Sequence, residues 1–393
     1  MSKLGWIPAA VLVYAASLSG AAAQVPETAS VQLPLIDAAQ IAKHVVGSLR
    51  PAAGERAVIV YDPTYYPGLA RAIELELNRA GVYPIVALTF DPPEVVRAQA
   101  ADPAGEKKRE EEVVSLLRPV FEKADIFLWL PGRELSSDLR WERLLSVSRA
   151  RGIHFHWIWP LSGKSAEEIA ALSRMYERAI LEADYAGLSA EQDRLIAALR
   201  GQVVRITTPG GTDLRLRVAP DAWFHKNDGD TSPDRARQAK SVRDREMEFP
   251  AGALRFIPDT SSAEGNLVVP RLATPRGVAE GVRLEFTGGR AVRWQAEKNQ
   301  AALEWLRELI GGDIDKVGEI VIGTHPLLVA TMPSGELPYF GYGTGYLRVS
   351  LGDNWESGGA NRSPSGRPLW LFLERATVEA GGKVLFRNGQ PAK

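Results

Sequence analysis

The sequence predicts two domains: an α/β domain with a mostly parallel sheet, followed by a β-rich α+β domain. Between residues 36 and 200, short β-branched and aromatic runs alternate with amphipathic stretches of helical length. This alternation is typical of a parallel sheet that is covered by helices on both faces. From residue 201 to 393 the pattern changes to strands and tight turns. At 393 residues, the chain is long enough for two separate cores.

The elements of the first domain follow one another in a regular order. Apolar runs of strand length predict strands at 57–62, 82–90, 126–131 and 153–160. Amphipathic spacing between these runs predicts helices at 63–81, within 105–125, at about 137–151, and from about 165 to 200.

The second domain is predicted from its turns. Pro209-Gly210-Gly211 turns a hairpin over 202–220, and Gly288-Gly289 turns another over 281–296. A polar loop is expected at 225–240, a helix at 298–311, and an apolar strand that begins the segment 317–328.

The N-terminus has the layout of a cleavable secretory signal. A lysine precedes an apolar stretch, and a small-residue tail with an Ala-x-Ala pattern ends at Ala23. The apolar stretch is shorter than the roughly 20 residues that span a membrane. Residues 1–23 are therefore predicted to be a signal peptide and 24–35 a linker, so that the mature protein is periplasmic or secreted and has no stable membrane anchor.

Composition excludes several classes of function. The net charge is −1, so there is no excess of positive charge with which to hold a nucleic acid. The chain has no cysteine, which excludes disulfides, thiolate metal sites and a lipoprotein anchor. Neither the Gly-x-Ser-x-Gly motif of serine hydrolases nor a P-loop is present.

Two positions stand out by residue chemistry alone. Glu319 lies in an otherwise apolar strand, where a carboxylate must be exposed, paired or a ligand. His325 follows six residues later, after a turn, and the two are the best catalytic candidates. His154 and His156 would share one face of a strand, a spacing that suits either a metal or an ordinary packed pair.

The second half of the chain resembles the aminopeptidase T family of thermophilic leucyl-type metallo-aminopeptidases. Six segments occur in the family's order: ITTPGGTDLRLRV, EFPAGALRFIPDTSSAEGNLVV, GVRLEFTGGRAVRWQAEKN, VGEIVIGTH, LRVSLGDNW and SGGANRS. The family also includes relatives that use iron to open dihydroxypyridine rings. The resemblance covers about residues 200–390 and implies an aminopeptidase T-type second domain, a paired zinc or cobalt site and a homodimer.

Most of the ligand set implied by this resemblance is missing. The family binds its metals through two glutamates, two histidines and an aspartate, and a tyrosine assists at the transition state. Ala253 stands at the first glutamate, Glu319 matches the second, Arg348 replaces the first histidine, and Trp355 replaces the tyrosine. No histidine follows His325, so both histidine ligands are absent however the segment is aligned.

Together with the predicted signal peptide, the resemblance and the missing ligands imply an exported aminopeptidase T-like pseudoenzyme with no metal cofactor. Its cleft is expected to bind a small peptide or an amino-acid-like ligand through Arg348, Trp355, Asp353, Asn354 and Asn361. The same residues could instead fill the vacated site with an ion pair and packed tryptophan.

Two active alternatives remain open. A metal-dependent leucyl-type aminopeptidase with a rearranged site would combine Glu319 and His325 with Asp259, Glu264 or His225. A metal-free enzyme would use Glu319 and His325 as an acid–base pair.

Overall fold

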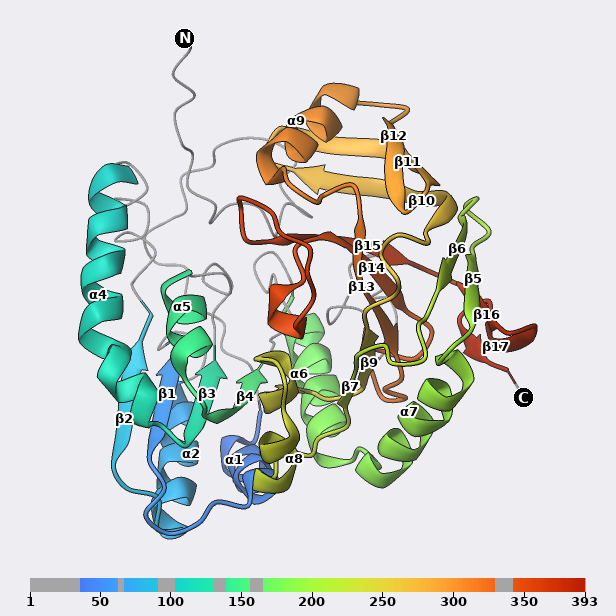
Figure 1. Ribbon diagram of the computed structural model, residues 1–393. Coiled ribbons are helices and arrows are strands. Elements are labelled where there is room, and N and C mark those ends of the chain that lie inside the picture. The colour runs from blue at the N-terminus through green and yellow to red at the C-terminus, as the bar shows by residue number, and fades with distance from the viewer. Residues whose placement is uncertain are drawn as a thin grey trace. The chain divides into compact units, whose positions relative to one another are not determined.

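The computed structural model describes residues 36–62, 67–90, 103–130, 139–155, 165–328 and 342–392 (Figure 1). The signal peptide and the linker predicted for residues 1–35 lie outside these ranges. The chain forms two compact units. Of the described residues, the first unit holds those from 36 to 181 and from 230 to 250, and the second holds those from 182 to 229 and from 251 to 392. In these ranges no helix is both long and apolar enough to cross a membrane.

The first unit is built on a five-stranded parallel sheet. Its strands are β1 (Ala57–Tyr61), β2 (Ile85–Thr89), β3 (Ile126–Leu130), β4 (Arg151–Phe155) and β8 (Glu246–Phe249). They are ordered β2-β1-β3-β4-β8, and every neighbouring pair is parallel. The arrows of β1 to β4 point the same way in Figure 1.

Helices cover this sheet because their apolar faces need burial. The helices of the unit are α1 (Ala38–Leu49), α2 (Pro67–Arg79), α4 (Pro103–Lys123), α5 (Leu139–Val147), α6 (Ala166–Leu181) and α8 (Pro233–Gln238), and a short 3-10 turn, η2, spans Arg243–Arg245. Phe121 of α4 and Leu144 of α5 join Phe127 and Trp129 of β3 in one buried cluster. The carboxylate of Asp37 caps α1 by accepting a hydrogen bond from the backbone N–H of Gln40 at 3.0 Å.

The second unit contains two sheets. Sheet B comprises β5 (Val203–Thr207), β6 (Asp213–Arg217), β10 (Glu264–Thr274), β11 (Gly277–Thr287), β12 (Arg290–Gln295), β16 (Thr377–Ala380), β17 (Lys383–Arg387) and β18 (Gln390–Pro391). Sheet C comprises β7 (Phe224–Asn227), β9 (Ala253–Phe256), β13 (Val317–Gly323), β14 (Leu347–Gly352) and β15 (Pro368–Leu373), in the order β15-β14-β13-β9-β7. The helices are α7 (Tyr185–Leu199) and α9 (Gln300–Ile310), with a 3-10 turn, η3 (Trp355–Ser357).

The predicted fold class is confirmed: a parallel α/β region is followed by a β-rich region. The two compact units are interleaved along the chain. Helix α7 belongs to the second unit, and residues 230–250 return to the first unit. Within the predicted loop 225–240 the structure places α8 and the end of β7, and shortly after it β8 adds a fifth strand beside β4. Strand β8 was not predicted there because it pairs with β4, which is distant in the sequence, and a local sequence pattern does not encode such a pairing.

Candidate functional site

Sheet C has one apolar face and one polar face, and the central side chains of both are buried. Paired and alternate residues of neighbouring strands share a face. The apolar face carries Leu254, Phe256, Ile320, Ile322, Leu347 and Val349. The opposite face carries His225, Asn227, Arg255, Glu319, Arg348 and Ser350, each less than 6% exposed. Because buried polar groups are costly unless they are paired, this polar face is the candidate site.

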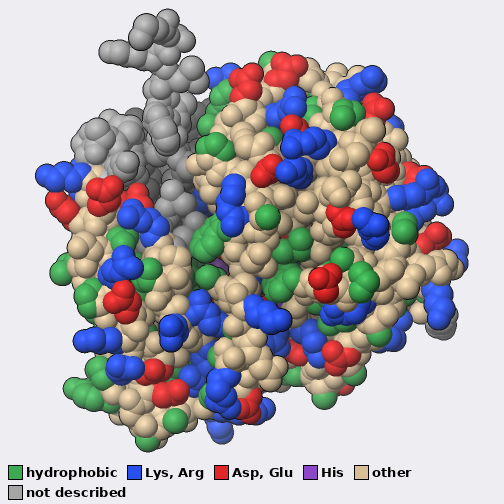
Figure 2. Space-filling model, in the orientation of Figure 1, with side chains coloured by type: hydrophobic (Ala, Val, Ile, Leu, Met, Phe, Trp, Pro, Cys, Tyr) green, Lys and Arg blue, Asp and Glu red, His purple; other side chains and the backbone are tan. Residues whose placement is uncertain are grey.

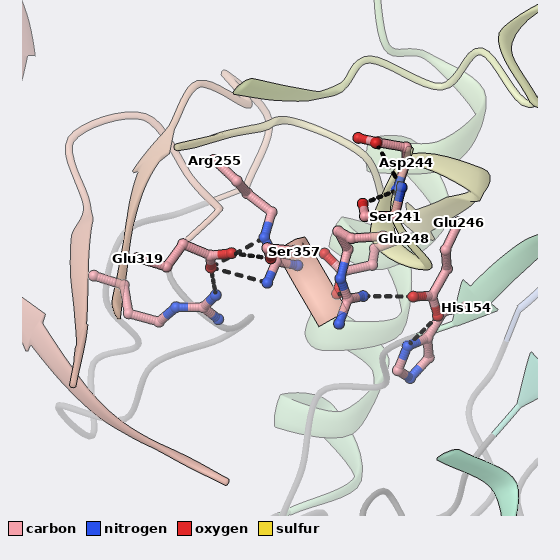
Figure 3. Close-up of polar contacts among 10 residues, drawn as sticks. His154, Ser241, Asp244, Glu246, Glu248, Arg255, Glu319 and Ser357 are labelled. Carbon is pink, nitrogen blue, oxygen red and sulfur yellow. Dashed lines mark hydrogen bonds and ion pairs between the residues drawn. The ribbon is translucent and has the colours of Figure 1, made fainter. Parts of the chain in front are cut away.

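Glu319 on β13 lies at the centre of a buried ion-pair cluster (Figure 3). Its Oε1 accepts hydrogen bonds from Arg255 Nε at 3.1 Å, from Arg255 Nη2 at 2.9 Å and from Arg348 Nη2 at 3.0 Å. Its Oε2 accepts one from the hydroxyl of Ser357 at 2.7 Å. Strand register brings these side chains together. Arg255 on β9 and Arg348 on β14 both pair with Val321 of β13, which lies two residues after Glu319 and therefore on the same face.

The electrostatics of the cluster keep Glu319 ionised. Burial alone would raise its pKa, but the charges of Arg255 and Arg348 and the hydrogen bond from Ser357 hold the pKa below its usual value. The two arginines carry two positive charges against this one carboxylate. Both guanidinium groups pair with Glu319, so its carboxylate is a counter-charge that they share.

Trp370 on β15 forms the side of the cluster near Arg348. The guanidinium carbon of Arg348 lies 4.4 Å from the centre of the Trp370 ring, which is a cation–π contact. Arg348 is only 1% exposed, so this contact and the bond to Glu319 fix its side chain in the interior.

The loop after β14 contains four of the five residues that the sequence predicted to bind a ligand. Asp353 accepts hydrogen bonds from the backbone N–H groups of Trp355 and Ser363, both at 3.0 Å. Asn354 donates to the carbonyl of Gly318 at 2.8 Å and accepts from the backbone N–H of Asn361 at 2.9 Å. These contacts hold the loop against β13, which places Ser357 within reach of Glu319.

Asn361 completes this anchoring, since its amide donates to the carbonyl of Val317 at 3.3 Å. Trp355 is partly exposed in η3. The fifth predicted ligand-binding residue, Arg348, belongs to the Glu319 cluster.

His325 is fully buried after the end of β13, and its Nδ1 accepts a hydrogen bond from the backbone N–H of Leu327 at 3.1 Å. The hydrogen bonds that Glu319 makes run to Arg255, Arg348 and Ser357. Both oxygens of Glu319 thus already accept hydrogen bonds, and proton transfer through the carboxylate would disrupt the cluster.

The residues proposed for a rearranged metal site have separate environments. Asp259 pairs with Arg217 and with Ser261, while Glu264 accepts from the backbone N–H of Gly288 at 2.6 Å. His225 stacks on Trp223 with ring centres 6.0 Å apart. Among the described residues, no group of three or more His, Asp or Glu side chains is arranged to hold a metal ion.

Three residues of the cluster, Ser357, Trp370 and Arg255, were not singled out from the sequence. Of these, Arg255 carries a sequence signal that could have identified it. It stands alone as a charged residue in the apolar stretch from Ala251 to Ile257, in the same manner as Glu319 in its own strand. The same argument about a charge in a buried strand, applied to this segment, would have found it.

A second buried ionic cluster belongs to the first unit (Figure 3). His154 Nδ1 lies 3.0 Å from Glu246, and Arg243 bridges Glu246 at 2.6 Å and Glu248 at 3.1 Å. Burial alone would raise the pKa of Glu246, but the charge of Arg243 and the hydrogen bond from His154 lower it to about 2. The cluster joins β4 to η2 and β8. His156, the second histidine of the predicted pair, lies outside the described residues.

Two solved structures have a similar fold. The chain superposes on AmpT from Thermus thermophilus with a TM-score of 0.62 and 16% sequence identity, over 91% of this chain and 99% of that chain. It superposes on 2,5-dihydroxypyridine dioxygenase from Pseudomonas putida with a TM-score of 0.59 and 15% identity, over 90% of this chain and 96% of that chain. No protein-family model and no curated protein matches the sequence. At this identity the likeness establishes an aminopeptidase T-like fold and nothing finer.

The residues around Glu319 do not suit a divalent metal. A metal ion bound to Glu319 would displace guanidinium groups of Arg255 and Arg348 or lie next to their positive charges. An arginine side chain carries a permanent positive charge, and its repulsion of a dication is strong where little water screens it.

Proposed function

We propose that this chain is an exported protein with an aminopeptidase T-like fold that binds a small carboxylate-bearing ligand and does not hydrolyse peptides. The ligand class is a short peptide or an amino-acid-like molecule. One observation carries the proposal: two buried arginines, Arg255 and Arg348, converge on the single carboxylate of Glu319.

Charge balance supports an anionic ligand. Two guanidinium groups on one buried face favour a negatively charged ligand over a neutral or positively charged one. Arginine suits this purpose because its planar N–H groups match a carboxylate. On the described part of the face seen in Figure 2 the surface charges of both signs are interspersed, so the proposal depends on the buried arginines and not on a charged patch of this face.

The absence of hydrolysis follows from the same cluster. Peptide hydrolysis by paired metals needs divalent ions that activate water and polarise the carbonyl. The positive charges of Arg255 and Arg348 oppose the entry of such ions, and the Ser357 hydroxyl occupies the second oxygen of Glu319.

The metal content of the protein tests this part of the proposal. The mature protein, beginning at Gln24, would be incubated with zinc, cobalt or iron and then desalted. We expect no stoichiometric metal in any of the three samples. Two equivalents retained per chain would overturn the proposal and would favour an active leucyl-type aminopeptidase with rearranged ligands.

Ligand binding is tested with glycyl-leucine and its C-terminal amide, which differ in the carboxylate. Calorimetry should show that the free acid binds at least tenfold more tightly than the amide. The reason is that a hydrogen bond between an arginine and a carboxylate is stronger than one between an arginine and a neutral amide. Arg348→Met should remove this preference. Equal binding of acid and amide by the wild-type protein would contradict a carboxylate site.

A further inference from the structure

The hairpin formed by β17 and β18 is closed by a two-residue turn, Asn388-Gly389. The backbone φ angles of these two residues are 49° and 80°, and this left-handed pair suits the twist of a tight hairpin. Asn388 is exposed, whereas Gly389 is buried. Asn388 is also the only asparagine of the chain that a glycine follows. The turn therefore exposes a side chain that can react with the backbone next to it.

An asparagine followed by a glycine can lose its side-chain amide in water. The backbone nitrogen of Gly389 attacks the side-chain carbonyl carbon of Asn388, and the new N–C bond closes a five-membered imide ring. The side-chain nitrogen leaves as ammonia and takes the proton that the backbone nitrogen loses. Water then opens the ring at either carbonyl and leaves aspartate or isoaspartate. A side chain on the following residue would hinder the attack, and glycine has none.

The folded turn restrains the attacking nitrogen. The N–H of Gly389 donates to the carbonyl of Ala376 at 2.8 Å, and the N–H of Asn388 donates to the hydroxyl of Thr377 at 3.1 Å. Gly389 also packs closely on Gly345, where an added Cβ would lie 2.3 Å from the Gly389 carbonyl oxygen. The reaction therefore requires the turn to move away from the start of β16.

The position of β18 makes a local opening of this turn accessible. The strand comprises only Gln390 and Pro391, which pair with Arg387 and Phe386, and it is a terminal strand of sheet B. Proline contributes no N–H to the pairing. Short segments at the edge of a structure open at a lower free energy than the whole domain unfolds. The turn can thus open while the rest of sheet B stays paired.

We infer that Asn388 is a site of spontaneous deamidation in the folded protein, and that the Thr377 hydroxyl slows the reaction by holding the turn closed. The reaction at Asn388 does not depend on the proposed function. Isoaspartate adds one methylene to the main chain, so the product no longer fits a two-residue hairpin turn. Its formation should release β18 and uncover the edge of β17.

Incubation of the mature protein at mildly alkaline pH, followed by peptide mapping, tests this inference. Deamidation adds about 1 Da to the peptide that contains Asn388, and isoaspartate is identified by its enzymatic methylation. Asn388 should react before every other asparagine. A synthetic peptide of residues 384–392 has no folded turn and should react at least about tenfold faster than the protein.

Two variants of Thr377 separate the role of its hydroxyl from that of its shape. Thr377→Val removes the acceptor and should deamidate about threefold or more faster than the wild type, because one hydrogen bond no longer opposes opening. Thr377→Ser keeps the hydroxyl and should react at the wild-type rate. Urea unfolding of both variants shows whether the rest of the protein remains folded.

Three results would overturn the inference. The first is a mass gain at another asparagine while Asn388 is intact, and the second is an intact Asn388 after about a hundred half-lives of the peptide. The third is equal rates in the peptide and the protein, which would mean that the turn gives no protection. Equal rates in folded Thr377→Val and the wild type would remove Thr377 from the inference and leave Asn388 as the reactive site.

Discussion

Replacing Glu319 with glutamine tests whether the ion-pair cluster holds the second unit together. Glutamine has nearly the same shape as glutamate, so Glu319→Gln removes the charge and leaves little change in packing. It removes the carboxylate charge with which Arg255 and Arg348, only 5% and 1% exposed, both pair. We therefore expect a large loss of stability from a change of a single atom.

The magnitude follows from the contacts of the carboxylate. Glu319 accepts three hydrogen bonds from guanidinium groups and one from the Ser357 hydroxyl. Removing one partner of a buried ion pair destabilises a protein by about 3–5 kcal/mol. We expect Glu319→Gln to lower the free energy of unfolding by an amount in this range.

Urea unfolding, followed by tryptophan fluorescence at neutral pH with EDTA present, measures this loss. The matched control is Glu308→Gln, which removes an exposed carboxylate on α9 and should change stability by less than about 0.5 kcal/mol. The double variant Glu319→Gln with Arg348→Met buries one positive charge fewer than Glu319→Gln alone. It should be less destabilised than the sum of its two single variants by about 1 kcal/mol or more.

Two results would refute this reasoning. If the unfolding free energy of Glu319→Gln lies within about 0.5 kcal/mol of the wild-type value, solvent screens the cluster and the ion pairs contribute little to stability. Strict additivity in the double variant would mean that Glu319 and Arg348 do not interact in solution.

Three further predictions follow from the structure. The pKa of Glu246, about 2 against 4.5 for a free glutamate, means that the group stabilises the fold by about 3 kcal/mol above pH 4.5. This contribution is lost as the pH falls toward 2. Glu246→Gln should therefore make the unfolding free energy depend less on pH between about 4.5 and 2, and an unchanged curve would exclude the pairing of Glu246 with Arg243 and His154. Asn354→Ala removes the bonds to Gly318 and Asn361 and should lower the unfolding free energy by about 1–3 kcal/mol, whereas a neutral result would show that the loop is not anchored there. EDTA should leave the melting temperature unchanged, because a metal bound only to the folded state would stabilise it, and a drop of several degrees would reveal such a metal.

Local patterns in the sequence contain most of the fold. The apolar run at β3 and the helix that ends before Gly81 follow directly from strand and helix periodicity, and the Gly288-Gly289 turn marks the β11–β12 hairpin. Strand β8 could not be predicted in the first sheet, because its partner β4 lies about ninety residues earlier and nothing local encodes that pairing.

The candidate site was only partly visible in the sequence. Glu319 is recognisable because a carboxylate in a buried strand needs a partner, but the identity of the partner depends on how three strands align. The contact between Arg348 and Trp370 is likewise a product of strand register, not of sequence spacing. Asp353 and Asn354 are typical of residues that cap turns with their own side chains, and the structure uses them in this way.

The Glu319 cluster connects stability with the proposed binding. Glu319 fixes the guanidinium groups of Arg255 and Arg348 on the buried polar face of sheet C. Buried ion pairs are costly to keep, since apolar side chains of similar size would pack there without the electrostatic cost. Under the proposed function this cost has a purpose, because a planar guanidinium pairs strongly with a carboxylate where little water competes. Stability measurements on Glu319 variants and binding measurements on Arg348 variants therefore test the same cluster.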